Sequence, residues 1–128
     1  MNILEAWETP EVVSYILRKI GIRADLLGFD YLCTAIEMTV ADINCLHNMT
    51  KVLYPEVAKV HNTKATRVER AMRHCIECML NECRAAFAVY ELTALPADNV
   101  TNSMFIGTLT RLITREPHNP IFEVRDYR

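Results

Sequence analysis

Basic side chains that could bind a nucleic-acid backbone or read base edges are concentrated between Lys51 and His74. This segment has six lysines and arginines and two glutamates, so 6 − 2 gives +4 in a chain whose formal charge is −2, and the remainder carries −6. Such a patch on an acidic body favours a polyanion at one place, because screened fields reach only about 8–10 Å at physiological salt. The alternative interpretation is a solvated helix face whose arginines serve solubility.

The spacing of these residues predicts one polar helix face. At about 100° per residue, Thr66, Arg67, Arg70, Arg73 and His74 fall within about a third of the circumference. One face can therefore pack against a core while the other contacts DNA. The residues that point the other way are apolar or small: Val68, Ala71, Met72, Cys75, Ile76 and Met79.

A short helix and a polar turn precede this amphipathic segment. Pro55 fits the first turn of the short helix, because proline is tolerated there. The turn is His61-Asn62-Thr63. Two helices joined in this way are typical of a helix-turn-helix, whose second helix enters the major groove. The apolar positions of the short helix are Leu53, Val57, Ala58 and Val60.

The start of the basic helix has two interpretations that give Glu69 different roles. If Thr63 is the N-cap, Glu69 lies well inside the helix and is free to face a ligand. If Thr66 is the N-cap, Glu69 completes a capping box and satisfies a backbone amide. The sequence leaves both open.

The remaining elements are also predicted to be helical, and strand-like alternation is nearly absent, so we expect an all-α fold. A first helix begins at Thr9 and Pro10 and ends at Gly21, a second runs from about Phe29 to Leu46, and the last covers about Asn102 to Thr114. The apolar positions of the first helix are Val12 or Val13, Ile16, Leu17 and Ile20, and those of the second are Leu32, Ile36, Val40 and Ile43, with Gly28 at its start. Beyond Asn81 the apolar positions are Phe87, Tyr90 and Leu95. Those of the last helix are Phe105, Ile106, Leu109, Leu112 and Ile113.

The 128 residues fit a single domain, with a core over about 10–115 and a tail over 116–128. No apolar run approaches the roughly 20 residues of a membrane span, and the N-terminus lacks a signal-peptide pattern. We therefore expect a cytoplasmic protein that does not contact a membrane.

Five cysteines form an odd set without secretory context, which favours reduced thiols. Cys75 and Cys78 lie inside the basic helix, but no second pair completes four zinc ligands, so buried, inert thiols and no metal are expected. The sequence has no glycine-rich phosphate loop, no HExxH motif and no convincing nucleophile and base, so we expect neither an enzyme nor a cofactor. The other cysteines are Cys33, Cys45 and Cys83.

Two longer strings suggest a family. TKVLYPEVAK at 50–59 and RVERAMRH at 67–74, with Asn62-Thr63 between them, closely resemble the DNA-binding effector domain of the stage-zero sporulation master regulator of endospore-forming bacteria. The resemblance spans roughly Val12 to Leu112. Supporting matches are Ile20-Gly21-Ile22, Gly28-Phe29, Tyr31-Leu32, Ala35-Ile36, Thr101-Asn102-Ser103 and Phe105-Ile106.

The resemblance implies a compact six-helix domain whose third and fourth helices form the helix-turn-helix, with the helix over about 64–82 in the major groove of double-stranded DNA. Arginine can bond guanine O6 and N7 together, and glutamate can accept from cytosine N4, whereas lysines on phosphates set affinity and register. Family members bind tandem, TGTC-containing sites as pairs, which implies a homodimer on DNA. The implied base-reading residues are Arg67, Glu69, Arg70 and Arg73, and the implied phosphate contacts are Lys51, Lys59, Thr63, Lys64, Thr66 and His74.

Three departures from the family pattern qualify this expectation. The first helix begins near Pro10, which leaves no room for the family's phosphoacceptor receiver domain, so we expect a protein not switched by its own phosphorylation. The segment over about 81–99 is shorter and differently composed than the stretch thought to touch the RNA polymerase sigma subunit. Met104 replaces an acidic capping-box partner. The alternative function is a protein-interaction module or antagonist that pairs with a full-length sporulation regulator without reading DNA.

Overall fold

The computed structural model describes residues 1–82, 93–96 and 98–124, and within these ranges the regular elements are helices and helical turns. Their only extended pairing is one isolated antiparallel bridge between Asn2 and Glu123. The all-α prediction is therefore confirmed. The α-helices are α1 (Ile3–Ala6), α2 (Thr9–Lys19), α3 (Leu27–Ala41), α4 (Tyr54–Val60), α5 (Ala65–Glu82) and α7 (Asn102–Arg115), and the shorter turns are η1 (Ile43–Asn48), η2 (Met49–Leu53) and η4 (Pro120–Phe122).

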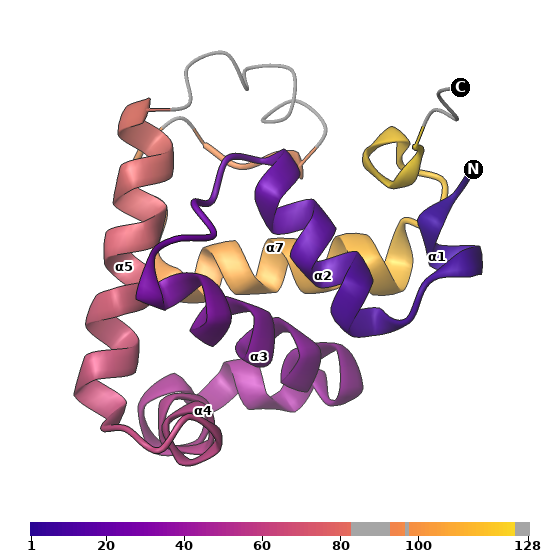
Figure 1. Cartoon of the computed structure of the whole chain (residues 1–128). Coiled ribbons are helices and arrows are strands. Elements are labelled where there is room, and N and C mark those ends of the chain that lie inside the picture. Colours follow the sequence, from indigo (N-terminus) through magenta and orange to yellow (C-terminus); the bar gives the residue numbers. More distant parts are fainter. Residues whose placement is uncertain (83–92, 97, 125–128) are drawn as a thin grey trace.

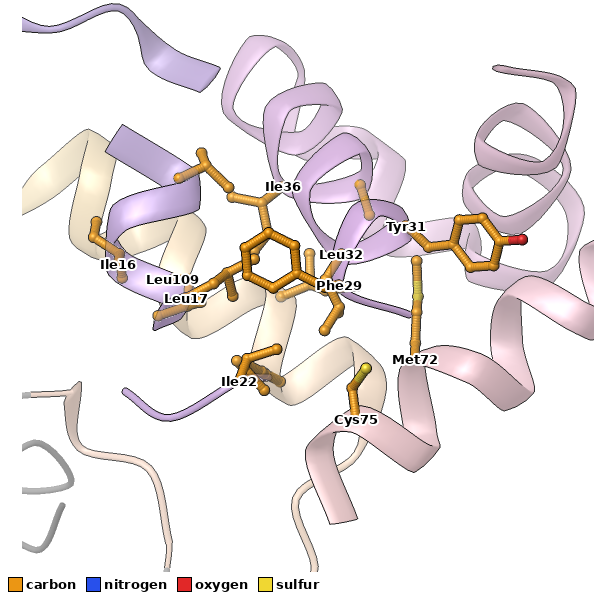
Figure 2. Close-up of a cluster of buried hydrophobic side chains, with 14 of the residues drawn as sticks. Ile16, Leu17, Ile22, Phe29, Tyr31, Leu32, Ile36, Met72, Cys75 and Leu109 are labelled. Carbon is orange, nitrogen blue, oxygen red and sulfur yellow. The ribbon is translucent and has the colours of Figure 1, made fainter. Parts of the chain in front are cut away.

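Helix α3 is the centre of the fold, because it packs against α2, α4, α5 and α7. Figure 1 shows α5 along one edge of the molecule, with α4 at its N-terminal end. In Figure 2, Met72 and Cys75 point from α5 into the cluster that Phe29 and Leu32 of α3 also line. Burial of this apolar side anchors α5 and leaves its opposite side at the surface.

The predicted first helix is observed as α2. Its apolar positions, from Val12 to Ile20, are buried. The chain leaves the helix at Gly21, whose φ of 100° is a left-handed conformation that glycine adopts without steric cost. Thr9 is the first residue of the helix, and the N-cap position is Glu8, which makes no side-chain capping bond.

The second predicted helix is shorter than expected. Helix α3 ends at Ala41, because Asp42 adopts an extended conformation and its carboxylate accepts a hydrogen bond from the Asn44 N–H at 3.0 Å. The chain continues through the 3₁₀ turn η1 and the π turn η2, so Ile43 lies outside the helix. Gly28 lies within α3 and is buried, where α3 and α5 approach closely, instead of marking the start of the helix.

The expected helix-turn-helix segment consists of α4, a tight turn and α5. Asn62 has a φ of 52°, and the Thr63 N–H donates to the Ala58 carbonyl oxygen at 2.9 Å, which closes the turn. Pro55 lies in the first turn of α4 as predicted. Of the apolar residues of this segment, Leu53, Val57 and Ala58 are buried, whereas Val60 is 61% exposed.

Helix α5 begins at Ala65, and the Lys64 carbonyl oxygen accepts from the N–H groups of Arg67 and Val68. Thr66 is therefore inside the first turn, and the capping-box interpretation of Thr66 and Glu69 is wrong. The observed start of α5 at Ala65 is closer to the start expected with Thr63 as the N-cap than to the start expected with Thr66. Glu69 is well inside the helix, which leaves its side chain available for other contacts.

The core extends beyond the expected 10–115. Ile3 of α1 and Ile121 and Phe122 of η4 are 0% exposed and belong to the main hydrophobic cluster. Part of the segment before 10 and the η4 part of the expected tail over 116–128 therefore help to build the core. The last four residues lie outside the described part of the chain.

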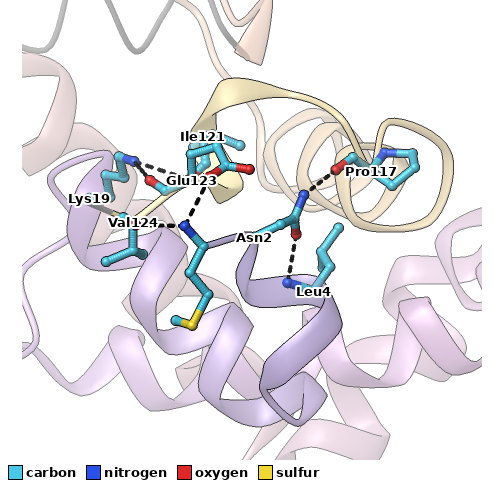
Figure 3. A network of polar contacts seen from close by, with 8 residues as sticks. Asn2, Leu4, Lys19, Pro117, Ile121, Glu123 and Val124 are labelled. Carbon is cyan, nitrogen blue, oxygen red and sulfur yellow. Dashed lines mark hydrogen bonds and ion pairs between the residues drawn. The ribbon is translucent and has the colours of Figure 1, made fainter. Parts of the chain in front are cut away.

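Polar contacts between the two ends hold these segments together (Figure 3). The Met1 ammonium group donates to the Glu123 carboxylate at 3.2 Å, and the Asn2 side-chain amide donates to the Pro117 carbonyl oxygen at 2.8 Å. The N-terminus and η4 lie on the side of the molecule away from α5 (Figure 1). The ends therefore stabilise the fold at a distance from the basic helix.

Candidate nucleic-acid interface

Helix α5 presents a charged outer face and an apolar inner face. Arg67, Arg70, Arg73 and His74 are exposed. The inner residues are at most 1% exposed, which confirms the amphipathic pattern expected from the sequence. The exposed side is therefore free to meet a partner without disturbing the core. The inner residues are Val68, Met72, Cys75, Ile76 and Met79.

A depression of about 690 Å³ lies where the turn meets the first half of α5. In the part of the chain that the structure describes, Lys64, Arg67 and Arg70 have no ion-pair partner. Three unneutralised cations on one concave surface create a local positive potential suited to an anion. The residues that line the depression are Asn62, Thr63, Lys64, Thr66, Arg67, Arg70 and Ala71.

Glu69 and Arg73 behave differently from these cations, because they pair with each other one turn apart on α5. Arg73 Nη1 lies 3.0 Å from Glu69 Oε1, and Nη2 lies 3.4 Å from Oε2. The Arg73 side chain is 54% exposed and that of Glu69 31%. The pair orients the arginine and partly neutralises it, so it presents a polar hydrogen-bonding unit more than a net charge.

A second depression of about 630 Å³ lies on the side of α5 that faces the start of α7. The predicted base-reading residues are thus divided between two neighbouring surfaces, with Arg67 and Arg70 on the turn side and Glu69 and Arg73 on the α7 side. The lining residues are Met49, Thr50, Tyr54, Glu69, Arg73, Glu77, Asn99, Val100, Thr101, Asn102 and Ser103.

The predicted phosphate contacts are spread more widely. Lys51 in η2 and Lys59 in α4 are exposed and line neither depression. The Lys59 ammonium lies 3.8 Å from the Glu56 carboxylate, and its side chain is 79% exposed. Thr63 and Thr66 line the turn-side depression together with Lys64, so only this part of the set is brought together with Arg67 and Arg70.

His74 contacts a thiol that the sequence analysis assigned to the core. Its Nε2 lies 3.6 Å from Cys78 Sγ, and Cys78 is half-buried. Only Cys75 is fully buried among the described cysteines, where burial raises the pKa of its thiol to about 11. The expectation of buried thiols therefore holds for Cys75 and is wrong for Cys78. The other half-buried free thiols are Cys33 and Cys45, and Cys83 lies outside the described residues.

The described side chains do not gather three or more histidine, cysteine or acidic groups in a geometry that could hold a metal ion. Among the same residues, no helix has the length and apolar character needed to span a bilayer.

Sequence reasoning gave no role to Asn102 and Tyr54. The Asn102 side-chain amide donates to Tyr54 Oη and to the Glu69 carbonyl oxygen, both at 3.1 Å. Burial raises the pKa of Tyr54, and the Asn102 hydrogen bond acts in the opposite direction. A signal was present, because Asn102 stands three and four residues before Phe105 and Ile106 and so lies on the inward stripe of α7. A polar residue at such a position points to a buried hydrogen bond.

The segment that departs from the family pattern is only partly described. Phe87 and Tyr90, predicted to form an apolar edge, lie outside the described residues, whereas Leu95 is 6% exposed. At the start of α7, the Thr101 hydroxyl accepts from the Met104 N–H at 3.1 Å. Only one of the two hydrogen bonds of a capping box is therefore present, because a methionine side chain cannot accept a hydrogen bond from the Thr101 N–H.

Two helices joined by a tight turn, with a basic outer face on the second helix, have the form of a helix-turn-helix DNA-binding domain. A comparison with known protein families identifies the family to which the chain belongs. The family described as "Sporulation initiation factor Spo0A C terminal" matches residues 13–113 of the 128-residue chain, so the chain belongs to this family. It is a sporulation-related effector domain of the DNA-binding, transcription-regulating class.

Proposed function

We propose that this protein is a sequence-specific transcription regulator that reads the major groove with the exposed face of α5. The observation that carries this proposal is the turn-side depression, where Lys64, Arg67 and Arg70 stand without carboxylate partners in the described structure. The chain as a whole has a formal charge of −2, so its positive potential is local. Such a surface favours one docking orientation on a polyanion over general adhesion.

The proposed roles follow from side-chain chemistry. The planar guanidinium groups of Arg67 and Arg70 can each bond guanine O6 and N7 together. Glu69 and Arg73 act as a paired unit at an adjacent base pair, where the carboxylate can accept from cytosine N4. The remaining contacts position the domain on the backbone without reading sequence. These backbone contacts are Lys51, Lys59, Thr63, Lys64, Thr66 and His74.

We further propose that two copies occupy tandem sites on DNA. A single α5 offers few base-reading side chains, and pairing doubles the contacts that one duplex can make. Sedimentation of the protein with duplexes carrying one or two sites tests this. Two copies bound to the double site, more tightly than two independent single sites predict, is the expected result. Independent filling of the two sites would contradict pairing.

A salt-dependent DNA titration tests the main proposal. The affinity for a duplex with the family's TGTC-containing element is compared with that for a scrambled duplex of equal length. We expect selective binding, with log K falling by about 0.9 per phosphate contact for each unit of log salt. Equal, weak binding to both duplexes would overturn sequence reading. In that case, a complex formed without DNA with a full-length sporulation regulator would favour the interaction-module function.

A further inference from the structure

Asn102 occupies an unusual place for a polar residue. It is the first residue of α7 and only 8% exposed, on the same face as Phe105 and Ile106, which are 0% exposed. An amide removed from water at such a position is costly unless its hydrogens are bonded. Its contacts therefore indicate what this residue does.

The Asn102 amide joins three helices. One donated hydrogen bond reaches Tyr54 Oη at the start of α4, and the other reaches the Glu69 carbonyl oxygen in the second turn of α5, each at 3.1 Å. The two amide hydrogens match the two acceptors. Hydrogen bonds are directional, whereas apolar contacts are not, so this junction restricts rotation of α5 in a way that core packing alone does not.

A second contact holds α5 from another side. Gly28 of α3 lies against the main chain of Ala71, two residues after Glu69. Two residues correspond to about 200° around a helix axis, so α3 and α7 hold α5 from nearly opposite sides. The α7 contact is at the turn of α5 that carries Glu69 and Arg73, whose ion pair lines the depression beside Asn102.

We propose that Asn102 is a positioning residue that fixes the rotation of α5 on α4 and so sets the base selectivity of the Glu69–Arg73 pair. This inference rests on the proposed DNA-reading function. Asn102 acts through the backbone of Glu69, and Tyr54 assists it by fixing the orientation of the amide. Loss of the amide therefore leaves the charges of the interface intact and changes only where they point.

Asn102→Ala tests this role, with Thr108→Ala on the same helix as the control, because Thr108 lines neither depression. We expect Asn102→Ala to lower the ratio of cognate to scrambled affinity about 3- to 10-fold, the change that one hydrogen bond can produce. The salt slope and the affinity for the scrambled duplex should each stay within about twofold of the wild-type value, since the phosphate contacts are unchanged. Thr108→Ala leaves the ratio unchanged.

Two double variants separate positioning from general weakening. Because Asn102 acts through Glu69 and Arg73, its effect on selectivity should disappear in an Arg73→Ala background and persist in a Lys59→Ala background. Circular dichroism and unfolding establish that each variant is folded. If Asn102→Ala does not fold, Tyr54→Phe keeps the amide, removes one acceptor and should lower selectivity in the same direction.

The outcomes are distinct. A folded Asn102→Ala or Tyr54→Phe variant with unchanged selectivity, or an equal loss in the Arg73→Ala background, overturns the positioning role while the proposed function stands. If the wild-type chain itself shows no selectivity, the proposed function fails and this inference fails with it.

Discussion

Gly28 of α3 lies directly against the main-chain carbonyl group of Ala71 in α5. A Cβ atom at Gly28 would come within 2.6 Å of the Ala71 carbonyl carbon and 2.7 Å of Cys75 Sγ. Main-chain atoms cannot move aside as a flexible side chain can. The absence of a side chain at this position therefore determines how closely the basic helix approaches the core, and with it the orientation of the exposed face.

Gly28→Ala should lower the free energy of unfolding by about 1–3 kcal/mol, the usual cost of forcing extra volume into a packed interior. Urea unfolding followed by circular dichroism measures this change. The same displacement of α5 should reduce cognate DNA binding in the protein that remains folded. An unchanged unfolding midpoint would show that the two helices can separate without cost.

Gly107→Ala is the matched control, because Gly107 also lies inside a helix. The nearest atoms to its added Cβ are the guanidinium nitrogens of Arg111, at 3.2 and 3.4 Å, and that exposed side chain can move. Alanine favours a helix over glycine by about 1 kcal/mol. Gly107→Ala should therefore leave the stability unchanged or raise it, opposite in sign to Gly28→Ala.

The sequence predicted the elements that carry a strong period and clear end signals. Helix α2 has an apolar stripe that ends at Gly21, and α7 has one that follows Thr101. It failed where the deciding contact is distant in the chain. The buried position of Ile3 depends on pairing with the segment around Glu123, which a four-residue helix without a period does not reveal.

The candidate site was also predicted only in part from the sequence. Periodicity located the exposed arginines of α5, since that face is defined by the helix itself. It did not show that Glu69 pairs with Arg73 while Arg67 and Arg70 stand apart, because this depends on rotamers and on the neighbouring α7. The inward position of Asn102 on α7 indicates a buried hydrogen bond, but the sequence does not identify its partners, which are 33 and 48 residues away.

Glu69→Gln should lower the base selectivity of DNA binding while leaving the stability of the fold nearly unchanged. An i,i+4 pair at this exposure contributes only about 0.3–0.5 kcal/mol, so the free energy of unfolding should change by less than about 0.5 kcal/mol. Removing the carboxylate frees Arg73 for any phosphate or base, so affinity for a scrambled duplex should rise more than affinity for the cognate one. Parallel titrations of the two duplexes measure this loss of selectivity.

Glu77→Gln is the control for that variant, because Glu77 is exposed on the same helix and has no ion-pair partner in the described structure. It removes the same charge without freeing Arg73. We expect equal gains in affinity for both duplexes. Equal gains from Glu69→Gln as well would mean that Glu69 contributes charge alone.

Stability should fall at alkaline pH. Burial raises the thiol pKa of Cys33 to about 12 and that of Cys75 to about 11, from 9.0, and it also raises the pKa of the Tyr54 hydroxyl. The folded state thus holds these protons more tightly than the unfolded chain. The resulting stability is fully present below pH 9.0 and is lost as the pH rises towards 11 and 12.

The urea midpoint should therefore be constant from pH 7 to 8 and decline above about pH 9, where the unfolded thiols begin to ionise. Cys75→Ala removes one of the groups and should make the decline shallower, although it lowers the midpoint at every pH by creating a small cavity. A midpoint that rises between pH 9 and 10.5 would have the wrong sign and would contradict the raised pKa values.

Arg70→Ala and Lys59→Ala should weaken DNA binding in different ways. Arg70 lines the turn-side depression, and its loss should cost about 1–3 kcal/mol at a cognate site and relax the preference for one base. The Lys59 side chain is 79% exposed and lines neither depression, and its proposed role is a backbone contact. Its loss should weaken all sequences alike and reduce the salt slope by about one unit.

The selectivity between cognate and substituted duplexes, and not the total affinity, distinguishes these two variants. Each removes one positive charge, so both lose attraction to the polyanion, and only Arg70→Ala should change the ratio between cognate and substituted duplexes. Arg115→Ala, at the exposed C-terminal end of α7, controls for charge far from the proposed interface and should leave the ratio and the slope nearly unchanged. Equal, uniform losses from Arg70→Ala and Lys59→Ala would assign Arg70 to the backbone. Base reading would then depend on Arg67 and the Glu69–Arg73 pair alone.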